Sequence, residues 1–261
     1  MSKAMSDATT RFSARVAEYV KYRPGYPAAV ASLLEREAKL MQDSVIVDIG
    51  SGTGLSSRLF LERGYRVSGV EPNREMREAG AALLTEFPRF TTIDGRAEAT
   101  GLPDASADLI IAGQAFHWFD TAATRTECRR ILKFGGTVAL IWNEWKIDSP
   151  FMRDLDAIVE RYQYESGRQI RDASRERIRE FFAPGKPERA DFPNGQDLDF
   201  DGLRGRIFSS SYLPKQGDPT GPAMLQEARS VFDRHAINGR IWWDYETEVW
   251  WGKFNPNLRK S

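Results

Sequence analysis

Short apolar runs alternate with longer segments of helical spacing through the first half of the chain. The apolar runs are bounded by Gly, Asp or Pro and predict strands at Val45–Ile49, Val67–Val70, Phe90–Ile93, Leu109–Ala112 and Val138–Trp142. The longer segments predict helices at about Pro27–Leu40, Leu55–Arg63, Arg74–Thr85 and Thr121–Leu132. Strands that alternate with single helices form right-handed βαβ units, so we expect a mostly parallel sheet covered by helices on both faces.

The pattern changes after Trp145. Two long charged segments, Phe151–Glu165 and Arg171–Phe182, have helical spacing and are followed by a stretch rich in Pro and Gly, Pro184–Asn194. These segments predict a lid over the main sheet. The last apolar segment, IWWDYETEVWWGKF, alternates bulky and polar residues, which predicts one more strand, added antiparallel to the sheet.

The composition indicates a globular protein with a small-molecule partner. A chain of 261 residues that is 41% hydrophobic can bury one large core, or one core and a smaller lid. Basic and acidic residues number 37 each, so no net charge favours nucleic acid or an anionic membrane. Cys128 is the only cysteine, which excludes an intramolecular disulfide and fits a reducing, cytoplasmic location. No apolar run approaches the ~20 residues that span a bilayer, and the opening residues lack the apolar stretch typical of a signal peptide, so we expect no export.

The strongest motif is a glycine-rich turn in VIVDIGSGTGLSSRLF. A buried strand runs through Asp48 into Gly50, Gly52 and Gly54, and a helix follows. Glycines let the backbone approach a ligand closely, and the helix offers unpaired N–H groups. Glu71 ends the next strand, where a carboxylate can hold ribose hydroxyls. A tight strand-to-helix turn without a ligand is the alternative interpretation.

The spacing of the glycines argues against a nicotinamide or flavin site. Such a protein has the pattern G-x-G-x-x-G, whereas Leu55 and Ser56 follow the last glycine of this turn and the third spaced glycine is missing. Asp48 also precedes the turn. Its carboxylate would be repelled by a pyrophosphate and attracted by an ammonium group. A nucleotide-dependent oxidoreductase is therefore the weaker alternative.

Several motifs resemble those of class I S-adenosylmethionine-dependent methyltransferases. VDIGSGTG followed by VSGVEPNREM is similar to the first two motifs of that family, and AEATGLPDASADLIIAGQAFHWFD is similar to the third and fourth motifs of its small-molecule branch, type 11. LKFGGTVALIWNEW resembles the fifth-strand segment. The likeness runs from Phe12 to Trp145. The segment IFSSSYLP and the final aromatic strand resemble, less closely, those of the trans-aconitate methyltransferase-like subgroup.

This resemblance implies an α/β, Rossmann-like fold. Its sheet would have seven mostly parallel strands, with an antiparallel C-terminal strand and a helical lid. The implied organisation is an N-terminal arm or lid over residues 1–26 and an S-adenosylmethionine-binding core over 27–145. A helical substrate-side lid with an added strand would follow over 146–237, and a C-terminal strand over 238–261 would complete the core sheet.

The resemblance also assigns cofactor contacts to residues of the first four motifs. The residues implied to bind the cofactor are Asp48, Gly50, Ser51, Gly52, Gly54, Glu71, Pro72, Asn73, Met76, Arg96, Ala97, Glu98 and Gln114. Asp48 and Gln114 would lie near the methionine end, Glu71 would accept from the ribose, and Met76 would flank the adenine. Arg96 occupies the position of an acid that normally receives the adenine amino group. A guanidinium has only donors, so backbone around Ala97 or the Glu98 carboxylate would take over that contact, unless Glu98 is a solvated loop residue.

The acceptor side is expected around His117, which follows the fourth strand. An unperturbed histidine pKa of ~6.5 suits a general base, although a histidine between aromatic residues is often only packed. Tyr22 and Arg23 of the arm resemble a substrate-side lid; a surface-packed aromatic arm is the alternative. Other pocket candidates are Trp118, Trp142, Asn143, Arg206, Ser211 and Tyr212, of which Trp142 also fits a core position.

The reaction implied by the resemblance needs no metal. A methyl group leaves a sulfonium by in-line displacement, which requires alignment and exclusion of water, and a carboxylate acceptor needs no base. The two histidines, His117 and His235, lie far apart in sequence and the acids show no ligand spacing. We expect a small-molecule acceptor, no nucleic acid or membrane partner, and a monomer or homodimer. A non-catalytic protein that binds S-adenosylmethionine or S-adenosylhomocysteine, and a nucleic-acid methylase, are further alternatives.

Overall fold

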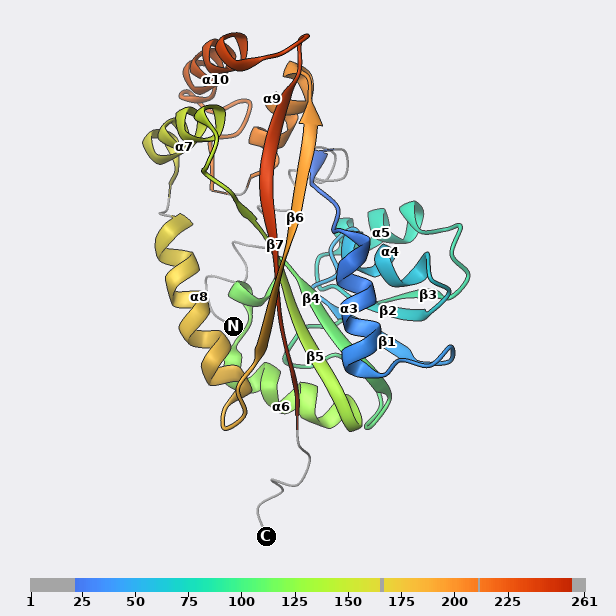
Figure 1. Cartoon of the computed structure of the whole chain (residues 1–261). Coiled ribbons are helices and arrows are strands. Elements are labelled where there is room, and N and C mark those ends of the chain that lie inside the picture. The colour runs from blue at the N-terminus through green and yellow to red at the C-terminus, as the bar shows by residue number, and fades with distance from the viewer. Residues whose placement is uncertain (1–21, 165–166, 211, 255–261) are drawn as a thin grey trace.

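A seven-stranded sheet forms the centre of the molecule (Figure 1). The computed structural model describes residues 22–164, 167–210 and 212–254, so Ser211 and most of the predicted arm lie outside the described residues. In chain order the strands are β1 (Val45–Ile49), β2 (Arg66–Val70), β3 (Phe90–Ile93), β4 (Ala107–Gly113), β5 (Leu132–Trp145), β6 (Glu188–Leu198) and β7 (Ile241–Lys253). They lie side by side in the order β3-β2-β1-β4-β5-β7-β6.

The first five strands are parallel, and β7 pairs antiparallel with both β5 and β6. The predicted mostly parallel sheet with an antiparallel C-terminal strand is therefore confirmed. The described helices are α3 (Ala28–Ala38), α4 (Leu55–Leu61), α5 (Arg74–Leu83), α6 (Thr121–Ile131), α7 (Pro150–Tyr162), α8 (Gly167–Phe182), α9 (Phe200–Phe208) and α10 (Gly221–His235). A short 3-10 helix, Phe116–Trp118, follows β4.

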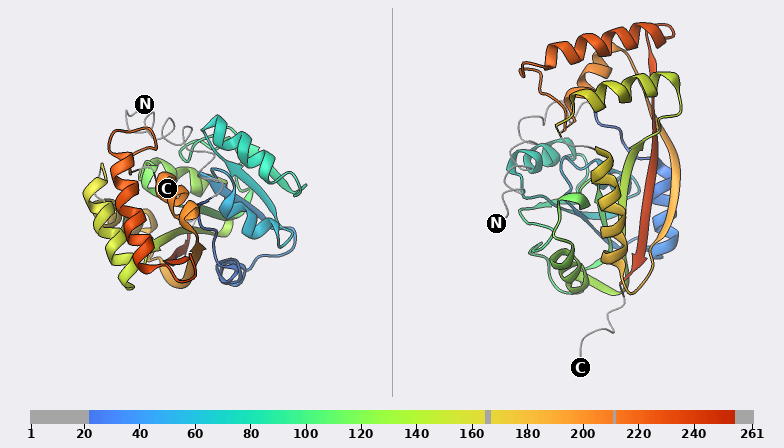
Figure 2. Two further views of the ribbon diagram at one scale, coloured as in Figure 1. Left: turned by 90° about the horizontal axis from the view of Figure 1, so that it is seen from above. Right: turned by 90° about the vertical axis from the view of Figure 1, so that its left-hand side faces the viewer.

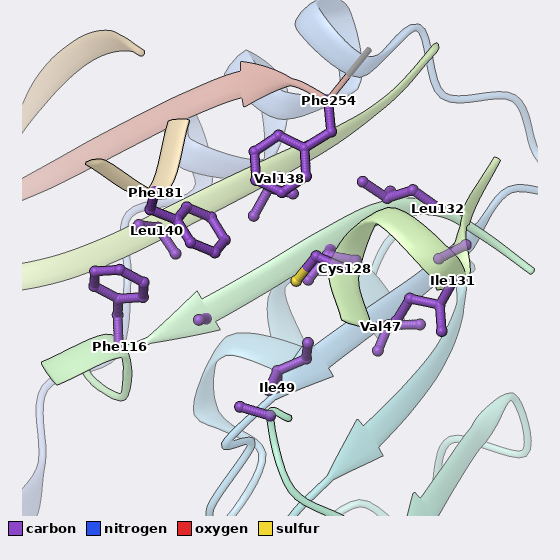
Figure 3. Packing of buried hydrophobic residues seen from close by; sticks show 14 of the residues in the cluster. Val47, Ile49, Phe116, Cys128, Ile131, Leu132, Val138, Leu140, Phe181 and Phe254 are labelled. Carbon is purple, nitrogen blue, oxygen red and sulfur yellow. The ribbon is translucent and has the colours of Figure 1, made fainter. Parts of the chain in front are cut away.

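Alternate residues of the parallel strands enter two separate hydrophobic clusters. Val47 and Ile110 face α6 and α8, whereas Ile46, Leu109 and Ile111 face α3 and α4. Figure 3 shows the first cluster, where Phe181 of α8 packs beside Phe116 and Phe254. Both faces of the sheet are thus covered, which explains why its central strands are continuous apolar runs.

A third hydrophobic cluster lies beyond the carboxyl ends of the parallel strands. Helices α7, α9 and α10 pack there on the extended parts of β6 and β7, and the views of Figure 2 show them beyond the main sheet. Trp243 and Tyr245 of β7 are fully buried in this cluster. These three helices are therefore built on strands of the main sheet, and their role as a lid stays a prediction. The exact division at residues 26, 145 and 237 stays a prediction.

One segment of the lid differs from its sequence pattern. The stretch Pro184–Asn194, which is rich in Pro and Gly and was expected to form part of the lid, enters β6 at Glu188. Pro193 is tolerated because β6 is the outer strand of the sheet, where a missing N–H need not interrupt the pairing. Among the described helices, none is long and apolar enough to cross a membrane.

We expect Phe181→Ala to lower the free energy of unfolding by about 3–5 kcal/mol, because the truncation leaves a cavity in a closely packed core. Phe181 is 1% exposed and its ring lies 5.0 Å from the rings of both Phe116 and Phe254. Urea denaturation measures the change. Phe134→Ala is the matched control, since Phe134 is 81% exposed and its loss should cost less than about 0.5 kcal/mol. Equal losses in the two variants would contradict this packing.

Candidate active site

The glycine turn between β1 and α4 has the geometry that the sequence predicts. Gly50, Gly52 and Gly54 have φ of +69°, +56° and +84°, a region that favours glycine. A Cβ on Gly50 would lie 2.7 Å from the Cβ of Ala115, and one on Gly54 would lie 2.4 Å from a methyl carbon of Leu84. Space and backbone conformation therefore both require glycine here, and the turn brings the end of β1 against the loop that follows β4.

Asp48 is a buried carboxylate that its surroundings satisfy only in part. Its Oδ2 accepts hydrogen bonds from the hydroxyls of Ser56 and Ser57, each at 2.7 Å. Its Oδ1 is sealed from solvent and has no hydrogen-bond partner in the described ranges. Burial raises the pKa of Asp48 to about 6, against the lowering effect of the two serines. An unsatisfied buried oxygen is costly, so the site favours a ligand that donates to it.

Glu71 joins the end of β2 to the glycine turn. Its Oε2 accepts from the backbone N–H of Gly52 at 2.9 Å, and its Oε1 accepts from that of Asn73 at 2.8 Å. Burial raises the pKa of this carboxyl, while the two backbone N–H groups oppose the shift. Each carboxylate oxygen can accept a second hydrogen bond. Glu71 can therefore hold the turn and still accept from two hydroxyls of a ligand.

The residues expected around the adenine lie at the start of α5 and in the loop after β3. Asn73 caps α5 by accepting from the N–H of Met76 at 3.0 Å, and Met76 itself is buried beside Gly52. Pro72 lies between Glu71 and this cap and is half-buried. These three residues thus lie together next to the glycine turn.

The loop after β3 turns sharply at Arg96. The backbone N–H and C=O of Arg96 pair with those of Ala99 at 3.1 Å, and Ala97 within this turn is buried. Glu98 Oε1 accepts from the N–H of Asp120 at 2.9 Å, at the start of α6. The Glu98 carboxylate is therefore neither a free loop group nor wholly available to an adenine amine.

Gln114 directly follows β4 and is tied to β5. It has a φ of +55°, its N–H donates to the carbonyl of Ile141 at 2.9 Å, and its Nε2 donates to the carbonyl of Asn143 at 3.0 Å. Asn143 in turn donates to the carbonyl of Gly25 at 3.1 Å. Gln114 therefore lies where the end of β4, β5 and the N-terminal segment meet.

His117 lies in the short helix after β4, half-buried, with its ring 4.8 Å from that of Trp118. Burial, together with the charges of Arg177 and Arg23, lowers its pKa to about 4. Such a histidine is neutral at pH 7 and holds a proton only weakly. The role of His117 as a general base stays a prediction. The low pKa of its ring argues against that role.

Arg177 of α8 holds the loop that carries His117. Its guanidinium donates to the carbonyls of His117, at 3.0 Å, and Phe119, and to the hydroxyl of Thr121 at 3.1 Å. It also lies over the ring of Phe116. The sequence does not indicate this residue, because a charged position on a helix with many charged residues gives no sign of the loop that it contacts.

The N-terminal segment crosses the lid and β6. A Cβ on Gly205 of α9 would lie 2.1 Å from ring atoms of Tyr22, so the tyrosine ring packs directly on that helix. Gln196 of β6 donates to the carbonyl of Tyr22 at 3.1 Å, and Arg23 donates to the carbonyl of Ser209 at 2.9 Å. The predicted substrate-side residues Tyr22 and Arg23 are therefore placed against the lid.

The remaining acceptor-side candidates separate into two groups. Arg206 is a buried residue of α9 that donates to the hydroxyl of Tyr245, and Tyr212 packs against the same lid cluster. Trp142 lies instead in the core of the sheet, edge-on to Phe116 at 6.2 Å, as its alternative interpretation predicts. The sequence did not identify Tyr245, although its alternation with Trp243 in the final strand placed both on one face.

Three carboxylates outside this region also come together. Oxygens of Asp191, Glu246 and Glu248 lie within 4.8 Å of one another on β6 and β7. The sequence did not predict this group, because strand register alone brings it together. Arg189 and Arg175 donate to Glu248 at 3.0 Å and 3.3 Å, so arginines already compensate part of its charge.

The strand order, the glycine turn after β1 and the acid after β2 define a Rossmann-like fold of the methyltransferase type. Residues 47–140 match the family model described as a methyltransferase domain. An uncharacterized methyltransferase of Mycobacterium tuberculosis is 33% identical over 173 residues, which are 66% of this chain and 66% of the relative. One of Schizosaccharomyces pombe is 32% identical over 151 residues, 58% of this chain and 59% of the relative. The matches thus span 66% or less of the relatives' own length.

Solved structures share the fold at low sequence identity. A protein described as a type II methyltransferase of Anaeromyxobacter dehalogenans has a TM-score of 0.69 at 22% identity, covering 90% of this chain and 99% of that one. A Haemonchus contortus N-methyltransferase in complex with phosphomonomethylethanolamine and S-adenosylhomocysteine has a TM-score of 0.53 at 16% identity, covering 97% and 59%. The family model, the relatives and these structures are thus all described as methyltransferases, and the structures share this chain's Rossmann-like fold.

We expect Arg177→Met to raise the pKa of His117 above 4, because one of the two cationic side chains that lower it is removed. The rise should be partial, since burial is the larger cause. A proton NMR titration of the histidine ring signals measures it, and the protein has two histidines, so assignment is direct. His235, which contacts Asp154 instead, is the internal control. An unchanged His117 titration would contradict this arrangement.

Proposed function

We propose that the chain transfers a methyl group from S-adenosylmethionine to a small-molecule acceptor, with a carboxylate or hydroxyl favoured. The observation that carries this proposal is the buried, partnerless Oδ1 of Asp48 beside the glycine turn. An ammonium group is the ligand that best satisfies a buried carboxylate oxygen. Nicotinamide and flavin cofactors would bring a pyrophosphate to this turn, and its charge would repel Asp48.

The residues at the carboxyl ends of β1, β2 and β4 fit the parts of this cofactor. Asp48, Gly50, Ser51 and Gln114 would hold the methionine end, and Glu71 the ribose hydroxyls. The residues left for the adenine are Pro72, Asn73, Met76, Arg96, Ala97 and Glu98. Because Glu98 already accepts from Asp120, backbone around Ala97 is the better partner for the adenine amino group. When bound, S-adenosylmethionine supplies an electrophilic methyl group on a positively charged sulfur.

The chain itself contributes alignment, exclusion of water and control of protons. An acceptor lone pair forms the new bond as the carbon–sulfur bond breaks, and the released electron pair stays on sulfur. A carboxylate acceptor becomes a neutral ester with no proton to remove, whereas a hydroxyl must lose one. His117, with its pKa of about 4, is a weak base for that proton. The arrangement therefore supports a carboxylate more than a hydroxyl.

The subgroup, the cellular location and the oligomeric state are also proposals. We place the chain near the trans-aconitate methyltransferase-like subgroup, in the cytoplasm, as a monomer or homodimer without nucleic-acid or membrane partners. The equal numbers of basic and acidic residues support the absence of nucleic acid.

We expect Glu71→Ala to weaken binding of S-adenosylmethionine at least tenfold, because the variant loses the ribose acceptor and the tie to the glycine turn. Calorimetric titration with S-adenosylmethionine and, separately, with NADH measures this. Glu78→Ala is the control, since Glu78 lies on the exposed face of α5 and pairs only with Arg74 among the described residues. Binding of NADH alone would overturn the methyltransferase proposal. Binding of S-adenosylmethionine without transfer to any acceptor would favour the non-catalytic alternative.

We expect the affinity for S-adenosylmethionine to rise from pH 5 to pH 7 and then level off. Asp48 is protonated below its pKa of about 6 in the free protein, and an ammonium ligand favours the ionised form. The change should approach about tenfold per pH unit below that pKa. Glu71 is the neighbouring titratable group, so Asp48→Asn and Glu71→Gln are compared over the same range. A pH dependence that persists in Asp48→Asn would contradict the role of Asp48.

A further inference from the structure

Arg206 is a charged side chain buried inside the lid. It lies on α9, is 3% exposed, and its Nε donates to the hydroxyl of Tyr245 at 2.7 Å. Its Nη1 donates to the hydroxyl of Ser210 at 3.0 Å and reaches that of Ser209 at 3.4 Å. A buried charge normally requires a paired charge of opposite sign, because desolvation is costly.

No such counter-charge is present in the described part of the chain. None of its carboxylates lies within 4.0 Å of Arg206, whereas Arg130 contacts both Glu127 and Asp104. The oxygen atoms that accept hydrogen bonds from the Arg206 side chain are hydroxyls, those of Tyr245, Ser209 and Ser210. Burial raises the pKa of Tyr245 to about 12, so this phenol is neutral at physiological pH. Among the residues that the structure describes, the positive charge of Arg206 is therefore uncompensated.

Aromatic rings give Arg206 part of its stabilisation. Its guanidinium carbon lies 5.0 Å from the ring centre of Trp243, 5.6 Å from that of Tyr245 and 6.0 Å from that of Trp145. Its Nη2 makes no hydrogen bond to any residue of the described ranges. Two of its three nitrogens are thus held in place, and the third is left to donate to a ligand.

A second arginine lies near this site. Arg23 donates to the carbonyl of Ser209, the same residue whose hydroxyl Arg206 reaches. The charge of Arg23 acts on both Tyr245 and His117, lowering the pKa of each. Arg23 therefore lies beside the residues that hold Arg206, and its charge also reaches His117 in the loop after β4, where the cofactor methyl group is expected.

We propose that Arg206, with Arg23 beside it, binds a carboxylate of the methyl acceptor. This inference rests on the proposed function and narrows its acceptor to an anion. A planar carboxylate matches the free donor of a guanidinium, and its charge compensates the buried cation. The aromatic rings around Arg206 favour a carboxylate attached to an apolar or planar group. Hydroxyl acceptors without an anionic group should be poor substrates.

The test uses the full-length protein saturated with S-adenosylhomocysteine, with benzoate and glutarate as probes and their neutral amides, benzamide and glutaramide, as counterparts. Calorimetry measures the binding of each. We expect at least one carboxylate to bind and its amide to bind at least tenfold more weakly. Arg206→Met should abolish this preference and Arg206→Lys should retain part of it. Arg204→Met, on the exposed side of the same helix, should leave it unchanged.

Two further measurements are the melting temperature and the affinity for S-adenosylmethionine. The first distinguishes an anion-binding arginine from a structural one, and the second shows whether the proposed function itself has failed. In the free protein, Arg206→Met should keep or raise the melting temperature, since it removes an uncompensated buried charge; a structural arginine would lower it. Its affinity for S-adenosylmethionine should stay within twofold of the wild type. Failure of the wild type to bind S-adenosylmethionine would overturn the proposed function, and the carboxylate and amide titrations would then be read on the protein without S-adenosylhomocysteine. Equal binding of carboxylates and amides, or no binding of either carboxylate, would overturn the Arg206 site.

Discussion

The pairing of β7 between β5 and β6 is the constraint on which the rest of the structure depends. One half of β7 places Trp243 and Tyr245 in the lid cluster, while the other half places Val249 and Trp251 in the core of the main sheet. Because the strand is continuous across both clusters, the lid is fixed in register to the parallel strands. The positions of α9 and of the N-terminal segment relative to the glycine turn follow from this register.

Two buried charges of opposite sign lie at the two ends of the proposed site. Asp48 is surrounded by serine hydroxyls and keeps one oxygen without a partner, and Arg206 is surrounded by hydroxyls and aromatic rings. Neither charge is neutralised by an ion pair among the described residues, although exposed pairs such as Arg58 and Glu62 are common on the surface. A buried charge without an ion pair is costly, and a bound ligand of opposite charge removes that cost, which is why we propose a ligand for each of them.

The arginines near the acceptor region also determine what His117 can do. Arg177 and Arg23 lower its pKa, and Arg177 fixes the carbonyls of the loop that carries it. A cationic environment disfavours a protonated histidine and attracts an anionic acceptor. The same charges that make His117 a poor base therefore favour chemistry that needs no base.

The cofactor side could be predicted from the sequence because its signals are local. Asp48, the three glycines and Glu71 lie in two short strand-to-helix connections, and the parallel sheet brings such connections to one edge. The acceptor side could be predicted only in part. The sequence identified Arg206 and Tyr212 but gave no reason why Arg206 is buried, and it missed Arg177 and Tyr245. Those side chains meet through strand register and helix packing between segments far apart in the chain, which local periodicity does not determine.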